Sequence, residues 1–416
     1  MRVMLAGASS GCGKTTVALA LLRALHNRGL RVAPFKAGPD YIDPGFHRAA
    51  CGAISHNLDE WLMPPEWVKG LPGSVPADLS VIEGAMGFYD GLGGPDRCSA
   101  CTLARLTDTP VILVLDASGS AASAAATALG FLHYRQPSNI AGALVNRVSG
   151  ERHFELVKSA LHDIGLPCAG WLPKDAAISL PDRHLGLVPA GELPGLENQI
   201  ERAAGLLHVD LDVLFAIARR AGALPASLPH EPPVLKGRRV AVASDAAFGF
   251  TYAAGLSSLE RMGAELSYFS PLHDAKLPGG VDSLYLPGGF PEVFEGELTD
   301  NRPMAESVRG AVAEGLKVYA ECGGMLYLSM IGALPVTWRM TDRLQRFGYV
   351  TLTDRDGQTF PAHEFHHSVT EGDLPQRFSV HSRRGDYREG YMLKNVLAGY
   401  PHVHFAGRPE LARRLL

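Results

Sequence analysis

The chain has 416 residues, 46% of them hydrophobic, and a formal net charge of −4. A chain of this length exceeds one ordinary hydrophobic core, so two domains are expected. The mild charge is unlike that of a nucleic-acid-binding surface, and no apolar run is long enough to span a membrane. Six scattered cysteines and a first strand without a preceding signal peptide indicate the reducing cytoplasm.

The first half of the chain alternates short apolar strands with amphipathic helices, a pattern typical of βαβ units around a parallel sheet. The predicted strands are residues 2–7, 31–36, 79–84, 110–116 and 140–146. The predicted helices are residues 14–28, 118–133, 151–164 and 209–222. We therefore expect an N-terminal α/β domain over residues 1–223.

A proline-rich segment without hydrophobic periodicity follows at residues 224–237, and we expect it to be a linker. A second α/β pattern then covers residues 238–416. Its predicted elements are a strand at 239–243, a helix at 251–262, a strand at 281–286, a helix at 302–315 and a strand that runs into Cys322. Residues 330–400 are richer in strand-forming patterns.

Residues 7–16 read Gly-Ala-Ser-Ser-Gly-Cys-Gly-Lys-Thr-Thr, between the first strand and a helix. In this context backbone N–H groups cradle phosphates, Lys14 reaches the β- and γ-phosphates, and the Thr15 hydroxyl binds Mg²⁺. The first glycine lies one residue further back than in the strict P-loop pattern, which resembles the dethiobiotin synthetase-like branch of P-loop proteins. The residues predicted to bind ATP are Gly11, Cys12, Gly13, Lys14, Thr15 and Thr16.

Carboxylates that follow predicted strands are the candidate Mg²⁺ ligands, because Mg²⁺ prefers oxygen ligands and open parallel sheets bind ligands at the carboxyl ends of their strands. We expect Glu83 and Asp40 to join Thr15 as metal ligands. The alternative for each acid is a solvated loop carboxylate. The residues predicted to bind substrate are Lys36, Tyr41 and Asp43. For Lys36 a structural ion pair is the alternative to a phosphate or carboxylate contact.

Cys322 stands between a strand-like segment and two glycines that permit a sharp turn into the next helix. The N-terminus of that helix is expected to favour the thiolate, the nucleophilic form of cysteine. An earlier glycine turn contains Gly288 and Gly289. Their backbone N–H groups, with that of Gly323, are predicted to receive an oxyanion. A buried structural cysteine is the alternative.

A cysteine nucleophile needs a base, and His402 and His404 lie near the C-terminus. The order of the glycine turn, Cys322 and His402 resembles that of class I glutamine amidotransferase domains, which implies that His402 is the base. His404 stands where those domains usually carry a glutamate, so a Cys-His pair without a full triad is expected. His404 is also the alternative base.

Residues 363–367 satisfy the H-E-x-x-H pattern of zinc proteases. That pattern binds zinc only on a helix, where residues i and i+4 share a face. Pro361 just before it and the Ser-Val-Thr sequence at 368–370 favour a strand. We therefore predict no zinc site here.

Over nearly its full length the chain resembles the cobyrinic acid a,c-diamide synthase family. The matching stretches, in family order, are residues 35–44, 57–59, 83–87, 146–147, 180–187, 286–289, 320–324 and 363–366. The resemblance implies an α/β fold with two parts. An N-terminal P-loop domain with a mostly parallel sheet is followed by a class I glutamine amidotransferase-like domain.

The resemblance also implies a glutamine-hydrolysing carbon–nitrogen ligase. Cys322 would release ammonia from glutamine, while ATP and Mg²⁺ activate a substrate carboxylate as an acyl phosphate that ammonia converts to an amide. The implied substrate is cobyrinic acid, a corrinoid amidated on its a and c acetate groups. Hydrogenobyrinic acid or nickel sirohydrochlorin as substrate, or a cobyric acid synthase, are alternatives.

A partner-binding P-loop ATPase is the non-enzyme alternative, although such a protein has no use for Cys322 and His402. A binding protein with only the amidotransferase fold would not need the Lys14-Thr15 loop. We expect glutamine and a tetrapyrrole acid as partners, and neither nucleic acid nor a membrane. A homodimer is left open.

Overall fold

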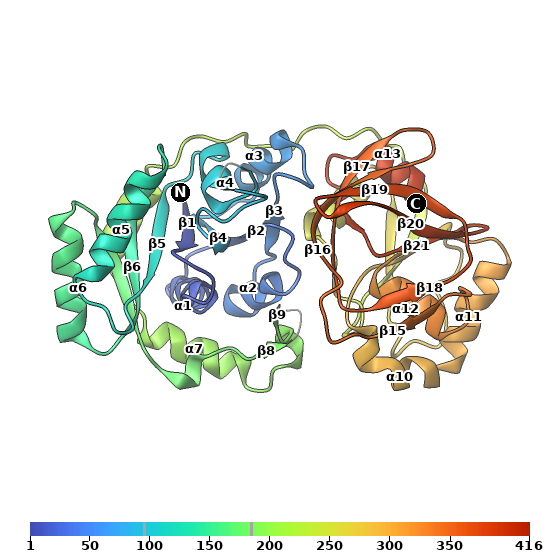
Figure 1. Ribbon diagram of the computed structural model, residues 1–416, viewed down its shortest axis with the longest axis horizontal. Coiled ribbons are helices and arrows are strands. Elements are labelled where there is room, and N and C mark those ends of the chain that lie inside the picture. The colour runs from blue at the N-terminus through green and yellow to red at the C-terminus, as the bar shows by residue number, and fades with distance from the viewer. Residues whose placement is uncertain (95–96, 184–185) are drawn as a thin grey trace. The chain divides into compact units, whose positions relative to one another are not determined.

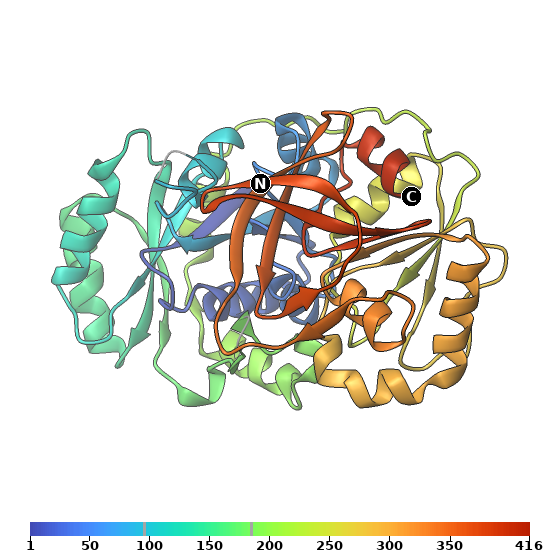
Figure 2. The ribbon, with the colours of Figure 1, turned by 45° about the vertical axis from the view of Figure 1, so that its right-hand side comes forward.

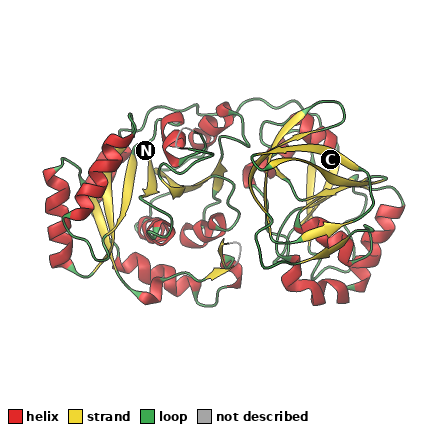
Figure 3. Cartoon of the chain, viewed as in Figure 1, coloured by secondary structure: helices red, strands yellow, loops and turns green. Residues whose placement is uncertain are grey.

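The computed structural model describes residues 1–94, 97–183 and 186–416, and these divide into two units, Met1–Pro229 and His230–Leu416 (Figure 1). The division falls within residues 224–237. Each unit is built around a large sheet flanked by helices (Figure 3). The predicted α/β fold class is confirmed. Among the described residues, no helix is both long enough and apolar enough to cross a bilayer.

The large sheet of the N-terminal unit has the strand order β10-β7-β6-β5-β1-β4-β2-β3. Its strands are β1 (Arg2–Gly7), β2 (Val32–Ala37), β3 (His56–Leu58), β4 (Leu79–Gly87), β5 (Val111–Asp116), β6 (Ile140–Val148), β7 (Cys168–Pro173) and β10 (His208–Val209). All neighbouring pairs are parallel except β10 with β7. The short strands β8 (Asp182–Arg183) and β9 (Gly186–Leu187) pair separately. The carboxyl ends of the parallel strands therefore share one edge of the sheet.

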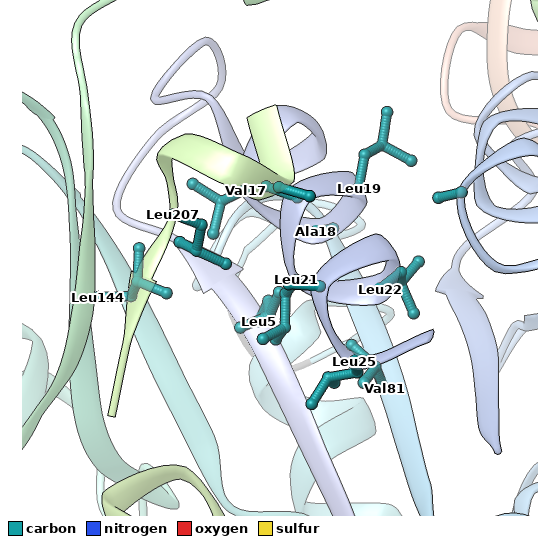
Figure 4. Close-up of a cluster of buried hydrophobic side chains, with 14 of the residues drawn as sticks. Leu5, Val17, Ala18, Leu19, Leu21, Leu22, Leu25, Val81, Leu144 and Leu207 are labelled. Carbon is teal, nitrogen blue, oxygen red and sulfur yellow. The ribbon is translucent and has the colours of Figure 1, made fainter. Parts of the chain in front are cut away.

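The helices of this unit connect and cover the parallel strands. They are α1 (Lys14–His26), α2 (Asp43–Cys51), α3 (Pro65–Ser74), α4 (Ala100–Leu106), α5 (Ser123–Tyr134), α6 (Glu151–Asp163), α7 (Leu196–Leu206) and α8 (Leu211–Ala218). Short 3₁₀ turns lie at Ala176–Ile178 and Ala190–Glu192. Because most residues of α1 are apolar, the helix is buried on several sides, and it packs against the sheet, α2 and α7. Figure 4 shows Leu21 and Leu25 of α1 packed beside Leu5 of β1 and Val81 of β4.

The C-terminal unit contains a mixed sheet with the order β12-β11-β13-β14-β21-β20-β19-β16-β17-β22. Its parallel part is β11 (Arg239–Ala243), β12 (Glu265–Phe269), β13 (Ser283–Leu286), β14 (Lys317–Glu321) and β21 (Val396–Gly399). Its antiparallel part is β16 (Arg346–Thr353), β17 (Thr359–His366), β19 (Gln376–Ser382), β20 (Gly385–Leu393) and β22 (His402–Val403). In Figure 2 the long strands of the antiparallel part, coloured orange to red, lie together.

The helices of the C-terminal unit lie mainly beside its parallel strands. They are α9 (Ala253–Arg261), α10 (Glu295–Asp300), α11 (Arg302–Ala313), α12 (Gly323–Met330) and α13 (Pro409–Leu415), with a 3₁₀ turn at Pro291–Phe294. The remaining strands, β15 (Thr337–Arg339) and β18 (Val369–Glu371), pair with each other. The predicted strand content of residues 330–400 is confirmed. The H-E-x-x-H residues begin within β17, as the upstream proline suggests.

The packing of α1 on the sheet yields a stability prediction. Leu21→Ala is expected to lower the free energy of unfolding by about 2–5 kcal/mol, because it leaves a cavity around a side chain that is fully buried. Guanidinium denaturation followed by circular dichroism measures this change. The matched control is Leu156→Ala in α6, whose side chain is 58% exposed and whose loss should cost less than about 0.5 kcal/mol. Equal losses for the two variants would contradict this packing.

Candidate functional site

The glycine-rich loop of the N-terminal unit lies between β1 and α1, at the carboxyl edge of the parallel strands. Gly11 and Gly13 have φ angles of 74° and 84°, a backbone conformation that residues with a Cβ rarely adopt. Asn146, on β6, donates its Nδ2 to the carbonyl of Cys12 at 2.8 Å. A Cβ on Gly13 would overlap that same Nδ2 atom. The loop conformation is therefore held by Asn146 and requires glycine.

A buried carboxylate lies beside this loop. Glu83 is 1% exposed and accepts hydrogen bonds from the Thr15 hydroxyl at 2.7 Å and from Lys36 Nζ at 3.0 Å. His47 Nε2 lies 2.8 Å from its second oxygen. Burial alone would raise the pKa of Glu83, but Lys36, His47 and Thr15 together hold that pKa well below its usual value. The side chain is therefore an anion at neutral pH.

The other predicted polar residues of this region separate into two groups. Lys36 is 4% exposed and pairs with Asp43 as well as with Glu83. Burial by itself would lower the pKa of Lys36, but these carboxylates raise it. Asp40 instead accepts from the backbone N–H groups of Ile42 and Asp43, at 2.8 and 3.0 Å, and Tyr41 is half-buried in the same turn. Lys36 thus joins Asp43 to Glu83, and Asp40 holds the turn before α2 while its charge also acts on Lys36.

The oxygen atoms of Thr15 and Glu83 suit Mg²⁺ bound together with a nucleotide. Among the residues that the structure describes, no group of three or more His, Cys, Asp or Glu side chains is arranged to hold a metal. Mg²⁺ commonly takes only one or two protein oxygens and completes its shell with phosphate and water. Lys14, which is 8% exposed, begins the helix next to them. These donors fit the expected metal without a protein cage.

In the C-terminal unit Cys322 occupies the sharp strand-to-helix turn that the sequence predicts. β14 ends at Glu321 and α12 begins at Gly323, with Cys322 between them at φ 45° and ψ −104°. A positive φ at a residue with a Cβ is strained and persists only where the surroundings hold it. Here the Cys322 N–H donates to the carbonyl of Gly399 on the adjacent strand β21, at 2.7 Å. The sheet thus holds the backbone of the proposed nucleophile.

The electrostatic surroundings of Cys322 differ from the expectation. Its side chain is buried, and burial raises the pKa of the thiol, an effect to which the charge of Glu292 adds. The backbone N–H of Gly323 opposes this but does not outweigh it. The thiolate that the helix N-terminus was expected to favour is therefore not the resting form. A base is needed to remove the proton when substrate binds.

The glycine turn predicted to form an oxyanion hole packs directly against this elbow. A Cβ on Gly323 would lie 2.9 Å from the nitrogen of Gly289. A Cβ on Gly289 would overlap the carbonyl oxygen of Ala247, and one on Gly288 would overlap the His402 ring. The structure therefore brings the backbones of Gly289 and Gly323 together, and no side chain can be added at these positions without displacing a neighbour.

The rings of His402 and His404 stack on different aromatic side chains. His402 is 1% exposed, and its ring stacks on His363 of β17 with centroids 5.0 Å apart. Its Nδ1 lies 3.6 Å from Oε2 of Glu321. His404 stacks on Tyr252 at 4.5 Å, and its Nδ1 accepts from the Ala406 N–H at 3.1 Å. Of the two histidines, His402 is the one placed over the Gly288 turn.

Sequence reasoning assigned no role to three buried polar residues of these sites: His47, Asn146 and Glu321. Asn146 ends a predicted strand, and a polar residue in that position is a usable signal. Glu321 directly precedes Cys322, and strand alternation places it on the same side of β14 as Tyr319. For His47 the sequence contains no comparable signal, because its partner Glu83 is 36 residues away.

The raised pKa of Cys322 predicts a specific pH dependence of its reactivity. In the absence of glutamine, the rate of alkylation by iodoacetamide should rise about tenfold per pH unit from pH 7 to pH 9, because the thiolate fraction is small below the pKa and grows as the pH approaches it. Mass spectrometry of the peptide that contains Cys322 measures the rate. In guanidinium-unfolded protein the same peptide should level off near the ordinary thiol pKa of about 8.5. A plateau below pH 8 in the folded protein would contradict the prediction.

Comparisons with known proteins extend over both units. Residues 3–188 match the family model described as the CobQ/CobB/MinD/ParA nucleotide binding domain, and residues 239–410 match that of the CobB/CobQ-like glutamine amidotransferase domain. The cobyrinate a,c-diamide synthase of Listeria monocytogenes serotype 4b is 42% identical to this chain, with 97% of this chain and 96% of the relative aligned. The Salmonella typhimurium protein of the same name is 40% identical, with 99% and 97% covered.

A relative named for a different substrate is as similar to this chain as the Salmonella typhimurium protein. The hydrogenobyrinate a,c-diamide synthase of Brucella anthropi is 40% identical, with 96% of this chain and 97% of the relative covered. In all three relatives the similarity includes both the nucleotide-binding part and the amidotransferase part. Because it extends over nearly the whole of each protein, the chain belongs to the cobyrinate a,c-diamide synthase family.

Proposed function

We propose that this protein uses glutamine and ATP with Mg²⁺ to amidate the a and c acetate carboxylates of cobyrinic acid, in the cytoplasm. One observation carries the proposal. A single chain that aligns with curated synthases over 97% of its length holds both a P-loop beside a buried carboxylate and a cysteine elbow beside a glycine turn. A partner-binding ATPase would need only the first of these sites.

In the glutaminase reaction His402 takes the proton of the Cys322 thiol, and the sulfur attacks the side-chain amide carbon of glutamine. The backbone N–H groups of Gly289 and Gly323 donate to the resulting oxyanion. The C–N bond then breaks, and His402 returns the proton to the leaving ammonia. Water hydrolyses the thioester to glutamate and restores the thiol.

In the ligase reaction an oxygen of the substrate carboxylate attacks the γ-phosphorus of ATP, and the bond to ADP breaks. Ammonia attacks the acyl carbon of the resulting acyl phosphate, and phosphate leaves with the electron pair of the C–O bond. Lys14 binds the β- and γ-phosphates, and Lys36 holds the carboxylates of Asp43 and Glu83 in place through its two ion pairs. Thr15 and Glu83 would hold Mg²⁺, which when bound neutralises charge on the phosphates.

Hydrogenobyrinic acid is the second candidate substrate, and the Brucella anthropi relative favours it because its identity to this chain is close to that of the cobyrinate enzymes. Both acids carry the carboxylates that the reaction requires. Parallel assays with each acid, ATP and glutamine, read by the mass of the product, decide between them. The proposal fails if neither acid gains amides.

Replacement of the nucleophile tests the division of labour between the two units. Cys322→Ala is expected to abolish glutamine-dependent amidation while activity with a high concentration of ammonium salt stays within about twofold of wild type, because ammonia replaces only the product of the glutaminase reaction. The matched control is Cys101→Ala, which alters another buried cysteine. Loss of both activities in Cys322→Ala would contradict the prediction.

Replacement of the buried carboxylate tests the nucleotide site. Glu83→Gln is expected to lower amidation about 100-fold or more with either glutamine or ammonia, because the charge that would bind Mg²⁺ is removed. A second readout is the affinity for a fluorescent ATP analogue, which Mg²⁺ should strengthen in the wild type but not in this variant. Glu66→Gln, an exposed residue of α3, is the control. Unchanged Mg²⁺ dependence in Glu83→Gln would count against its role.

A further inference from the structure

The residue immediately before the proposed nucleophile is a fully buried acid. Glu321 ends β14 with no exposed surface. Its Oε1 accepts from the Tyr319 hydroxyl at 2.9 Å and from the Val403 N–H at 3.1 Å, and its Oε2 accepts from the Tyr285 hydroxyl at 2.9 Å. Three neutral donors therefore converge on the two oxygens of one carboxyl group.

This donor set is built by the register of the parallel strands. Tyr285 of β13 lies opposite Tyr319 of β14, and Glu321 follows Tyr319 by two residues on the same side of the strand. Burial, together with the neighbouring charge of Glu321, raises the pKa of both tyrosines well above its usual value. Both hydroxyls therefore stay protonated and remain donors at neutral pH.

The arrangement leaves the carboxylate without an ordinary counter-ion. In the part of the chain that the structure describes, neither lysine nor arginine forms an ion pair with Glu321. A buried carboxylate without a cation is costly even when it is hydrogen-bonded. The group positioned to provide a positive charge is His402, whose Nδ1 lies 3.6 Å from Oε2. His402 becomes a cation only when it takes a proton.

We propose that Glu321 is a positioning residue for His402. Its Oε2 accepts the Nδ1–H of the imidazole, so that Nε2 is left unprotonated to take the proton of Cys322. The same carboxylate stabilises the imidazolium that this transfer creates. The inference rests on the proposed glutaminase reaction and assigns to Glu321 the part of the glutamate that usually follows the base by two residues in class I glutamine amidotransferase domains.

The distances and the neighbouring contacts support His402, rather than His404, as the histidine that Glu321 positions. A separation of 3.6 Å is within ion-pair range, and a ring movement of about 0.5 Å brings it to hydrogen-bond length. Glu321 also accepts a hydrogen bond from the backbone N–H of Val403, the residue after His402. The same carboxylate therefore contacts both the backbone of β22 and the imidazole ring of His402. The Nδ1 of His404, in contrast, accepts from a backbone N–H and therefore carries no proton.

Glu321→Gln separates positioning from a purely structural role, because the amide keeps the volume and an oxygen acceptor for the Val403 N–H but removes the charge. With ATP and cobyrinic acid saturating, we expect kcat for glutamine hydrolysis to fall about 10²–10³-fold, with KM for glutamine within about threefold. Amidation with ammonium salt should stay within about twofold of wild type. Glu231→Gln, at a buried carboxylate that holds the Gly407 N–H, should leave kcat within about twofold of wild type.

The outcomes are distinguishable. A kcat of Glu321→Gln within threefold of wild type overturns the inference. So does a fall in kcat matched by equal losses of thermal stability and ammonia-dependent amidation. If the amide variant does not fold, Glu321→Asp decides, because the shorter side chain withdraws the carboxylate from Nδ1 and wild-type kcat would then exclude a positioning role. Wild-type protein that hydrolyses no glutamine would refute the proposed function itself.

Discussion

Close approach of a neighbouring group to the backbone, which only glycine permits, is the constraint on which both sites depend. In the N-terminal unit, Gly13 leaves the space into which Asn146 reaches to hold the phosphate-binding loop. In the C-terminal unit, Gly323 lets the elbow of Cys322 come against the nitrogen of Gly289. Both turns join a parallel strand to a helix, so each site gathers at the carboxyl edge of its sheet, where backbone N–H groups are available to an anion.

The buried carboxylates of the two sites, Glu83 and Glu321, have different kinds of partner. Around Glu83, Lys36 and His47 surround a carboxylate with cationic or ionisable groups, which suits a pocket that receives phosphates. Around Glu321 the fixed partners are neutral hydroxyls and a backbone N–H. In the first arrangement Lys36 offsets the charge of Glu83 directly, in an ion pair. The second leaves the carboxylate able to respond when His402 is protonated, which is the property a proton-transfer site needs.

Much of the fold could be predicted because it follows from local patterns. The limits of β1, the start of α1 at Lys14 and the strand that ends beside Cys322 agree with the expected elements. The helix predicted from residue 118 begins five residues later, since α5 starts at Ser123. The helix α2 was not predicted, because nine residues with few apolar positions give only a short pattern. The protonation state of Cys322 could not be predicted, since it depends on burial by segments distant in sequence.

The sequence by itself determined the class of the protein: a glycine-rich loop before Lys14, an elbow around Cys322 and a late His402 are linear patterns whose chemistry depends on residue type and spacing. Only the tertiary structure decided which polar groups meet. Lys36 lies 47 residues before Glu83 and is brought opposite it by strand register. Glu321 lies 81 residues before His402, and the two meet because the chain runs directly from Gly399, the strand partner of Glu321, to His402. Charge interactions act through space, so a linear pattern does not reveal the partner of a buried acid.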